Sequence, residues 1–375
     1  MQPRRDEFYM DRALELAELA ICDVFPNPRV GAVIVSGDQI VGEGYHRGCG
    51  KDHAEIAAIA EAGEKAKGGT LYLNLEPCCH HGETPPCTDA IIQAGISRVV
   101  FGIIDPDERV RGRGAEILRD SGIEVTVGVR AGEAFELNYP FIFRKKTGRA
   151  LVTLKVAMTL DGKLAVPESG WFTSDRSREK VHYLRSYHEA VAVGIGTVLS
   201  DDPSLDRRYW SGGLRPPLRM VFDSDLRFPA GSRWFSDDHR VLIFCRRNPS
   251  PDAVSRLEEK GAEVIPLPGD QKGLDLRAWR DDVSDKGISS VLIEGGAGIS
   301  TSIFREGLVD IFYLFTAARV SGDAGLSWYG GPDEPEWIRD GGLSLERAEP
   351  SGGDVMAVYY SDLVRNHFDE LRKDR

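Results

Sequence analysis

The sequence predicts two α/β domains, 1–147 and 148–375. At 375 residues the chain exceeds one typical domain, and each half is long enough to bury its own core. Short apolar segments alternate with helical patterns through the first half, which favours an α/β sandwich around a mostly parallel sheet. A charged run over 143–149 is followed by the apolar strand 151–156. We expect the domain boundary at this run.

The composition is that of a globular protein, with 41% hydrophobic residues and no apolar run long enough to cross a membrane. The first residues also lack the apolar stretch of a secretory signal. Six cysteines in so long a chain do not suggest a disulfide framework, so we expect a reducing cytoplasm. The net charge of −12 argues against nucleic-acid binding, but it leaves room for a small phosphorylated substrate in a local basic pocket.

The opening segment carries apolar residues at helical spacing, with Asp6 as a fair N-cap. The later segments alternate between strand and helix patterns. The first half is therefore predicted to contain a helix over 6–21, a hairpin of strands 30–36 and 39–45, a helix over 53–61 ended by Gly63, a strand over 70–75, a helix beginning at Cys87, a strand over 99–104, a helix over 112–119 and a strand over 125–129.

The residues between His53 and Cys87 carry the chemistry of a hydrolytic zinc site. His53 and Glu55 stand two apart at a predicted helix start, Cys78 follows the predicted strand 70–75, and Cys87 begins the next helix. A catalytic zinc needs three protein ligands and an open position, together with a carboxylate that moves protons without binding the metal. His53, Cys78 and Cys87 suit the ligand roles, and Glu55 suits the role of general acid and base. First-turn amides of the next helix are expected to favour a thiolate at Cys87.

Two alternatives apply to this stretch. A closed structural zinc site would have four protein ligands and no use for Glu55. His80 and His81 could add ligands, but a fourth ligand would close the open position.

The eight residues between Cys78 and Cys87 depart from the shorter P-C-x-x-C spacing of many nucleobase deaminases. The stretch Glu-Pro-Cys-Cys-His-His-Gly-Glu-Thr-Pro-Pro-Cys instead resembles the bifunctional riboflavin-pathway family, in which a pyrimidine deaminase is fused to a reductase. Two positions depart from that family's pattern: Cys79 replaces a serine and Glu83 replaces a basic residue. The resemblance implies that Asn27 and His80 contact the pyrimidine; taken alone, Asn27 reads as a turn residue before proline.

Four stretches of the second half match the reductase part of that family in order. By its own pattern the first is a strand running into a turn. The resemblance implies a cytidine-deaminase-like α/β/α sandwich followed by a dihydrofolate-reductase-like α/β domain. The matching stretches are 153–163, 170–174, 196–205 and 293–297.

Glycines that directly follow an apolar strand at 291–293 allow the backbone to approach phosphates at a helix start, but a Gly-Gly pair alone is weak evidence and no G-x-G-x-x-G is present. The NADPH prediction therefore comes from the resemblance. It implies cofactor contacts from Ala157, Trp171, Thr197, Asp201, Ser224, Gly296, Ala297, Gly298, Ile299 and Ser300, and substrate contacts from Ser169, Arg185, Leu205, Arg208 and Glu294.

In the family the first half hydrolyses the 2-amino group of a pyrimidine, and the second reduces its ribosyl chain to ribityl. Lys155 and Asp201 are candidates for polar assistance near the sugar carbon, with a structural ion pair as the alternative. Because Glu83 cannot attract a phosphate, we expect Arg47 or Lys51 to take over that contact.

The resemblance also suggests a homodimer. Two rival hypotheses are an editing deaminase for transfer RNA or nucleobases with an appended domain, and a non-catalytic zinc-stabilised binding protein.

Overall fold

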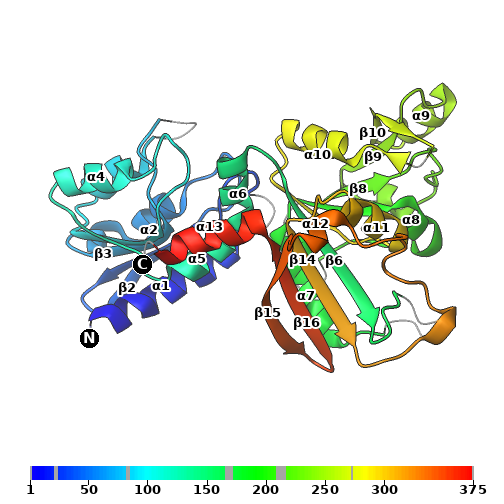
Figure 1. Cartoon of the computed structure of the whole chain (residues 1–375). Helices are drawn as coiled ribbons and strands as arrows, with labels where there is room; N and C mark the ends of the chain where they lie inside the picture. Colours follow the sequence, from blue (N-terminus) through cyan, green and yellow to red (C-terminus); the bar gives the residue numbers. More distant parts are fainter. Residues whose placement is uncertain are drawn as a thin grey trace. The chain divides into compact units, whose positions relative to one another are not determined.

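The computed structural model describes residues 2–20, 24–81, 85–164, 172–207, 217–271 and 273–373. The chain divides into two compact units (Figure 1). Unit 1 comprises Met1–Gly148 with Leu371–Arg375, and unit 2 comprises Arg149–Glu370. Each unit has its own sheet and its own apolar core, and each is described by itself below.

Unit 1 is built on a five-stranded sheet in the order β2-β1-β3-β4-β5. The predicted hairpin is confirmed, and β1 pairs antiparallel with both β2 and β3, whereas β3, β4 and β5 are parallel. The sheet is thus more mixed than predicted, because a tight hairpin forces its two strands to run antiparallel. The strands are β1 (Gly31–Ser36), β2 (Gln39–Tyr45), β3 (Thr70–Leu75), β4 (Arg98–Ile103) and β5 (Glu124–Val127).

Alternating strand residues of unit 1 face two different cores, which makes the sheet the middle layer of a sandwich. Ala32 and Ile34 pack with α2, α3 and α4, while Val33 and Val35 pack with α1. This is the two-residue periodicity of a strand that is covered on both faces. The helices are α1 (Gln2–Glu18), α2 (Ala54–Ala62), α3 (Cys87–Gln93), α4 (Arg113–Asp120), α5 (Ala131–Leu137) and α6 (Tyr139–Thr147), with a 3₁₀ turn η1 at Gly63–Ala66.

The first helix begins earlier than predicted, and Asp6 is not its N-cap. Asp6 lies inside α1, where its carboxylate accepts two hydrogen bonds from Arg98 at 2.8 and 2.9 Å and one from the Tyr72 hydroxyl. The prediction was wrong because this acid is paired with a buried arginine of β4, a contact 92 residues away in the chain.

Two glycines of β2 let α2 lie directly on the strand. A Cβ atom at Gly42 would stand 2.3 Å from the Ala58 carbonyl, and one at Gly44 would stand 2.4 Å from the Ala54 carbonyl. Any larger residue would push the helix away. This close contact sets the position of the N-terminus of α2, where His53 is the N-cap residue.

Unit 2 is built on a nine-stranded sheet in the order β10-β9-β8-β7-β13-β6-β14-β16-β15. All neighbours from β10 to β14 are parallel, and β16 and β15 form an antiparallel edge. The strands are β6 (Leu151–Thr159), β7 (Ala190–Gly194), β8 (Leu218–Phe222), β9 (Val241–Arg246), β10 (Ala262–Leu267), β13 (Ser290–Ile293), β14 (Ile311–Ala317), β15 (Leu343–Ser351) and β16 (Asp354–Ser361), with a small separate hairpin of β11 (Gly269–Asp270) and β12 (Gly273–Leu274).

The helices and 3₁₀ turns of unit 2 lie between these strands in the chain, except α13, which follows β16 and whose last residues belong to unit 1 (Figure 1). Among the residues that the structure describes, none of the helices has both the length and the apolar character that a membrane crossing requires. The helices are α7 (Asp175–Tyr187), α8 (Ile195–Asp201), α9 (Pro251–Glu258), α10 (Leu276–Asp285), α11 (Ala297–Arg305), α12 (Glu336–Arg339) and α13 (Asp362–Lys373), and the turns are η2 (Arg233–Phe235) and η3 (Gly322–Ala324).

The chain reverses its winding between β7 and β13. From β7 it passes through α8 to β8 on one side, and from β13 it passes through α11 to β14 beyond β6 on the other. Such a reversal leaves a crevice at the carboxyl ends of the two strands, which is where parallel α/β sheets bind ligands.

We propose that residues 1–147 form an independently folding domain, because unit 1 has its own sheet and buried cores. A fragment 1–147 is expected to show native-like circular dichroism and a cooperative thermal transition. An unfolded fragment, with a folded full-length chain as the control, would show that the two halves form one cooperative unit.

Candidate active sites

His53, Cys78 and Cys87 come together in unit 1, with their ligand atoms within 4.8 Å of one another. His53 Nδ1 lies 3.2 Å from Cys87 Sγ and 3.6 Å from Cys78 Sγ. Ligand atoms on a tetrahedral zinc, with bonds near 2.0 to 2.3 Å, stand about 3.5 to 3.8 Å apart. The donor set and its spacing therefore fit one zinc ion.

The two cysteines shift each other's pKa in opposite directions. The pKa of Cys78 is lowered to about 4, first by its hydrogen bond with the Cys87 thiol and further by His53. The pKa of Cys87 is raised by the same hydrogen bond and by burial. The backbone amide of Cys87 donates to Cys78 Sγ at 3.4 Å, so the first-turn amide of α3 favours a thiolate at Cys78 and not, as expected, at Cys87. A cation at the cluster would bind both cysteines as thiolates and so release their protons.

Glu55 is positioned beside this cluster but is not one of its three ligands. It lies in the first turn of α2 and is only 4% exposed. Its pKa is raised, first by burial and then by the negative charge on Cys78, while a hydrogen bond from the Cys87 thiol opposes the shift. A buried carboxyl with a raised pKa is suited to general acid and base chemistry at neutral pH.

Asn27 reaches the cluster through His46, a residue that the sequence did not single out. Asn27 Nδ2 lies 3.4 Å from His46 Nε2, and the His46 ring packs edge-on against His53 with centroids 5.3 Å apart. The other ring nitrogen of His46 lies 3.1 Å from the Asp52 carbonyl. No motif identifies His46 in advance, because its contact depends on the path of the loop before His53.

Glu76 fixes the loop that carries Cys78. Its buried carboxylate accepts hydrogen bonds from the amides of Asp105, Gly112 and Ala115 at 3.2, 2.9 and 3.1 Å. Two segments that are distant in sequence are thereby joined next to the cluster.

Cys79 points elsewhere, with its Sγ 3.6 Å from the Arg109 carbonyl. We therefore expect Cys79→Ala to retain zinc and Cys78→Ala to lose it, because only Cys78 belongs to the three-ligand cluster. Metal analysis of the purified variants gives the answer. Zinc retained by Cys78→Ala and lost by Cys79→Ala would show that the wrong cysteine has been assigned.

Unit 2 contains a cavity of about 1550 Å³ at the crevice between β7 and β13. Residues of α8, α11 and the β11–β12 hairpin line it, together with residues of β6, β8 and α10. The residues expected at the reductase site that line it are Lys155, Ala157, Thr197, Asp201, Ser224, Glu294, Gly296, Ala297, Gly298 and Ile299.

The two glycines after β13 serve different purposes. A Cβ atom at Gly295 would stand 1.9 Å from Ile299 Cγ2, so Gly295 is required for α11 to pack close to the strand. A Cβ at Gly296 would approach the Thr197 hydroxyl only to 3.5 Å, and the Gly296 amide donates to that hydroxyl at 3.2 Å. The start of α11 and the first turn of α8 thus line one crevice, whose backbone amides suit the phosphates of a dinucleotide.

Three charged side chains meet beside this cavity, and two of them, Lys155 and Glu294, line it. Arg185 binds Glu294 through two nitrogens at 2.5 and 2.9 Å, and Lys155 Nζ lies 3.9 Å from the same carboxylate. Burial lowers the pKa of Lys155, whereas Arg185 and Lys155 together hold the pKa of Glu294 below its usual range against burial. Glu294 therefore stays ionised between two cationic groups.

Comparison with known proteins bears on both sites. Residues 3–103 match the cytidine and deoxycytidylate deaminase zinc-binding region, and residues 150–354 match the RibD C-terminal domain. Riboflavin biosynthesis protein RibD of Aquifex aeolicus is 43% identical over 324 residues, which cover 86% of this chain and 89% of that protein. The chain belongs to the RibD family. The Escherichia coli RibD is 38% identical over 337 residues, covering 85% of this chain and 89% of that protein.

Solved structures of RibD proteins agree with this membership. Acinetobacter baumannii RibD, form 1, has a TM-score of 0.81 at 33% identity, covering 96% of this chain and 99% of that one. A Thermotoga maritima protein named as a diaminohydroxyphosphoribosylaminopyrimidine deaminase and 5-amino-6-(5-phosphoribosylamino)uracil reductase has a TM-score of 0.80 at 34% identity, covering 96% and 100%. As a RibD, this chain is a bifunctional enzyme of riboflavin biosynthesis with a deaminase-like first domain and a reductase second domain.

The remaining predicted residues of this RibD have different positions. Arg185 contacts Glu294, while Ser300 and Leu205 are buried and are not among the residues that line the cavity. His80 Nδ1 is buried and makes no hydrogen bond within the described part of the chain. A nitrogen in this state is available to a ligand. The residues Ser169, Trp171, Arg208 and Glu83 lie outside the described residues.

Several residues that line the reductase cavity were missed by the sequence reasoning. Phe172 and Thr173 belong to the stretch 170–174, which resembles the family, so the resemblance could have identified them as cavity residues. Arg277 on α10 and Arg305 on α11 also line the cavity, and neither lies in a recognisable motif.

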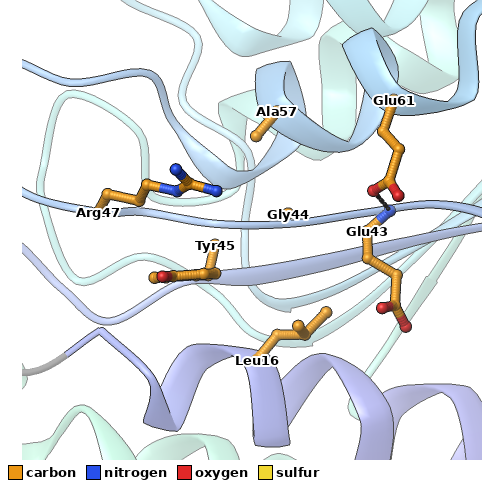
Figure 2. A pocket seen from close by; sticks show the side chains of 7 residues that line it. All are labelled: Leu16, Glu43, Gly44, Tyr45, Arg47, Ala57 and Glu61. Carbon is orange, nitrogen blue, oxygen red and sulfur yellow. Dashed lines mark hydrogen bonds between the residues drawn. The ribbon is translucent and has the colours of Figure 1, made fainter. Parts of the chain in front are cut away.

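Arg47 lines a pocket of unit 1. Figure 2 shows its side chain beside the Tyr45 ring, and the guanidinium carbon lies 5.4 Å from the ring centroid. None of the residues of the His53 cluster lines this pocket, and Lys51 is exposed in the loop before His53, so the phosphate contact of Arg47 or Lys51 stays a prediction. The pocket has a volume of about 360 Å³ and is lined by Leu16, Glu43, Gly44, Tyr45, Arg47, Ala57 and Glu61.

Proposed function

We propose that the first domain deaminates 2,5-diamino-6-ribosylamino-4(3H)-pyrimidinone 5′-phosphate and that the second reduces the ribosyl chain of the product to ribityl with NADPH. The observation that carries the proposal is the cluster of His53, Cys78 and Cys87 beside the buried Glu55, followed in the same chain by a crevice large enough for a dinucleotide. The activity named for the Thermotoga maritima relative supports this choice of substrate.

His53, Cys78 and Cys87 would hold Zn²⁺, which leaves one coordination position open. A zinc ion in such a site lowers the pKa of a bound water to about 7 and so supplies a nucleophile at neutral pH. Glu55 takes up a proton from the attacking water and delivers it to the departing amine, because it is buried beside the cluster without belonging to it. Asn27 and His80 orient the pyrimidine ring.

In the second domain, the residues around Gly296 and Thr197 would hold the NADPH phosphates, and Ala157, Trp171, Asp201 and Ser224 would line the rest of the cofactor site. NADPH supplies a hydride when bound. Arg185 and Glu294 position the substrate together with Ser169, Leu205 and Arg208. Lys155, with a pKa lowered by burial, can give up a proton near the reacting carbon more readily than an exposed lysine.

Two further parts of the proposal rest on the resemblance and the cysteine usage alone. The resemblance favours a homodimer, and few cysteines outside the zinc cluster favour a cytoplasmic enzyme. Sedimentation of the purified chain would test the dimer.

One assay separates the proposal from its rivals: metal content measured together with ammonia release from the diaminopyrimidine phosphate. We expect one zinc per chain and ammonia release from this substrate. Ammonia released only from a transfer RNA would favour an editing deaminase, and zinc without any deamination would favour a binding protein.

A further inference from the structure

A loop of unit 2, residues 202–206, has an unusual backbone conformation. Asp202 and Leu205 have φ angles of 38° and 50°, which is the left-handed region. For a branched, non-glycine residue such as Leu205 this conformation is strained and persists only where its surroundings determine it. At the start of the loop, the Asp202 carboxylate accepts hydrogen bonds from the Ser232 hydroxyl at 2.5 Å and the Arg233 amide at 3.0 Å.

Arg219 of β8 holds the middle of this loop from inside the protein. Its side chain is 1% exposed, and it donates to both carboxylate oxygens of Asp237 at 3.0 Å and to the Ser204 carbonyl at 2.7 Å. The guanidinium carbon also lies 5.6 Å from the ring of Trp234, whose Nε1 donates to the Pro203 carbonyl at 2.7 Å. A guanidinium can bind a carboxylate and a carbonyl at once because its donors form a rigid planar fork.

A second arginine holds the far end of the loop. Arg185 donates to the Asp206 carbonyl at 2.9 Å while its other nitrogens bind Glu294, and His182 Nδ1 also lies 2.9 Å from that carbonyl. Two arginines therefore fix carbonyls on either side of Leu205, which is only 3% exposed. Protein side chains therefore hold the loop at its start, at its middle and at its far end.

We propose that Arg219 is a positioning residue of the reductase, which holds loop 202–206 in its substrate-binding conformation before the substrate arrives. The inference rests on the proposed function, in which Glu294 lines the cavity and the resemblance assigns Leu205 and Arg185 to the substrate. Arg219 does not line the cavity, so it acts through the loop. A loop that is already ordered does not have to be ordered on binding, which raises affinity for the substrate.

The test replaces Arg219 by methionine, which has a similar length and no donors, in the full-length zinc-loaded chain. We expect the KM for the deaminated pyrimidine to rise about tenfold or more, the size of a lost hydrogen bond from a charged donor, with kcat little changed. The dissociation constant of NADPH, measured by calorimetry, should change little, and ammonia release by the first domain should be unaffected. Arg219→Lys retains one donor and should recover part of the KM effect.

Arg240→Met is the matched control, because Arg240 is an exposed arginine of the same region, 3.7 Å from Glu263. A folded Arg219→Met chain with a normal KM, or one in which kcat falls and KM does not rise, would overturn the positioning role and leave the proposed function intact. A wild-type chain that does not reduce the deaminated pyrimidine with NADPH would overturn the proposed function, and the role of Arg219 with it.

Discussion

Glu55→Gln is expected to retain zinc and to lower the deamination rate by a factor of about 10² to 10⁴, the usual contribution of a general acid and base. The amide keeps the size of the carboxyl group but cannot accept and return a proton. Because the proposed ligands are His53, Cys78 and Cys87 and not Glu55, the metal should remain bound. The deamination rate is measured as ammonia release, and the bound metal is measured as zinc content of the same preparation.

The matched control is Glu61→Gln, the same change on the exposed part of the same helix. This variant should deaminate at close to the wild-type rate. Full ammonia release by zinc-loaded Glu55→Gln would remove Glu55 from the mechanism. Loss of zinc in that variant would instead give Glu55 a role in metal binding.

The second large effect is expected in unit 2, where Glu294→Gln should lower the free energy of unfolding by about 3 to 5 kcal/mol and suppress reduction. The substitution leaves Arg185 buried without its carboxylate, and an arginine cannot relieve this by losing its proton. Lys155 can lose its proton more easily, because burial already lowers its pKa. We therefore assign most of the lost free energy of unfolding to Arg185.

All six tryptophans stand after residue 170, so tryptophan fluorescence during denaturant unfolding reports on unit 2 alone. The double variant Arg185→Met with Glu294→Gln should recover much of the stability lost by Glu294→Gln, although not the reductase activity. Equal destabilisation in the single and double variants would contradict the assignment to Arg185. Ammonia release serves as the internal control, since it belongs to unit 1.

The sequence was most informative where local signals and chemistry coincide. His53 precedes an alanine-rich helix and Cys87 follows two prolines, so the pattern predicted both helix starts together with the residues that form the cluster. The strands of unit 1 were also found, because apolar runs bounded by glycine or charge leave few alternatives.

Contacts between distant segments could not be predicted. Asp6 is a residue of the type that caps helices, but its partner Arg98 lies on a strand far along the chain. His46 is adjacent to His53 only because the intervening loop turns back. Arg219 gives no signal in the sequence, since a single arginine in an apolar strand is identified as a support for loop 202–206 only when Ser204 and Asp237 are seen around it.

The central claim is that one chain performs two successive reactions on one pyrimidine, and the order of the two reactions tests it most directly. The zinc-loaded chain is mixed with the diaminopyrimidine phosphate and NADPH, and ammonia release and NADPH oxidation are followed together. We predict that ammonia appears with or without NADPH, that NADPH oxidation begins only after ammonia release, and that Glu55→Gln stops both until the deaminated pyrimidine is supplied. NADPH oxidation that proceeds at the normal rate in Glu55→Gln without ammonia release would contradict the account.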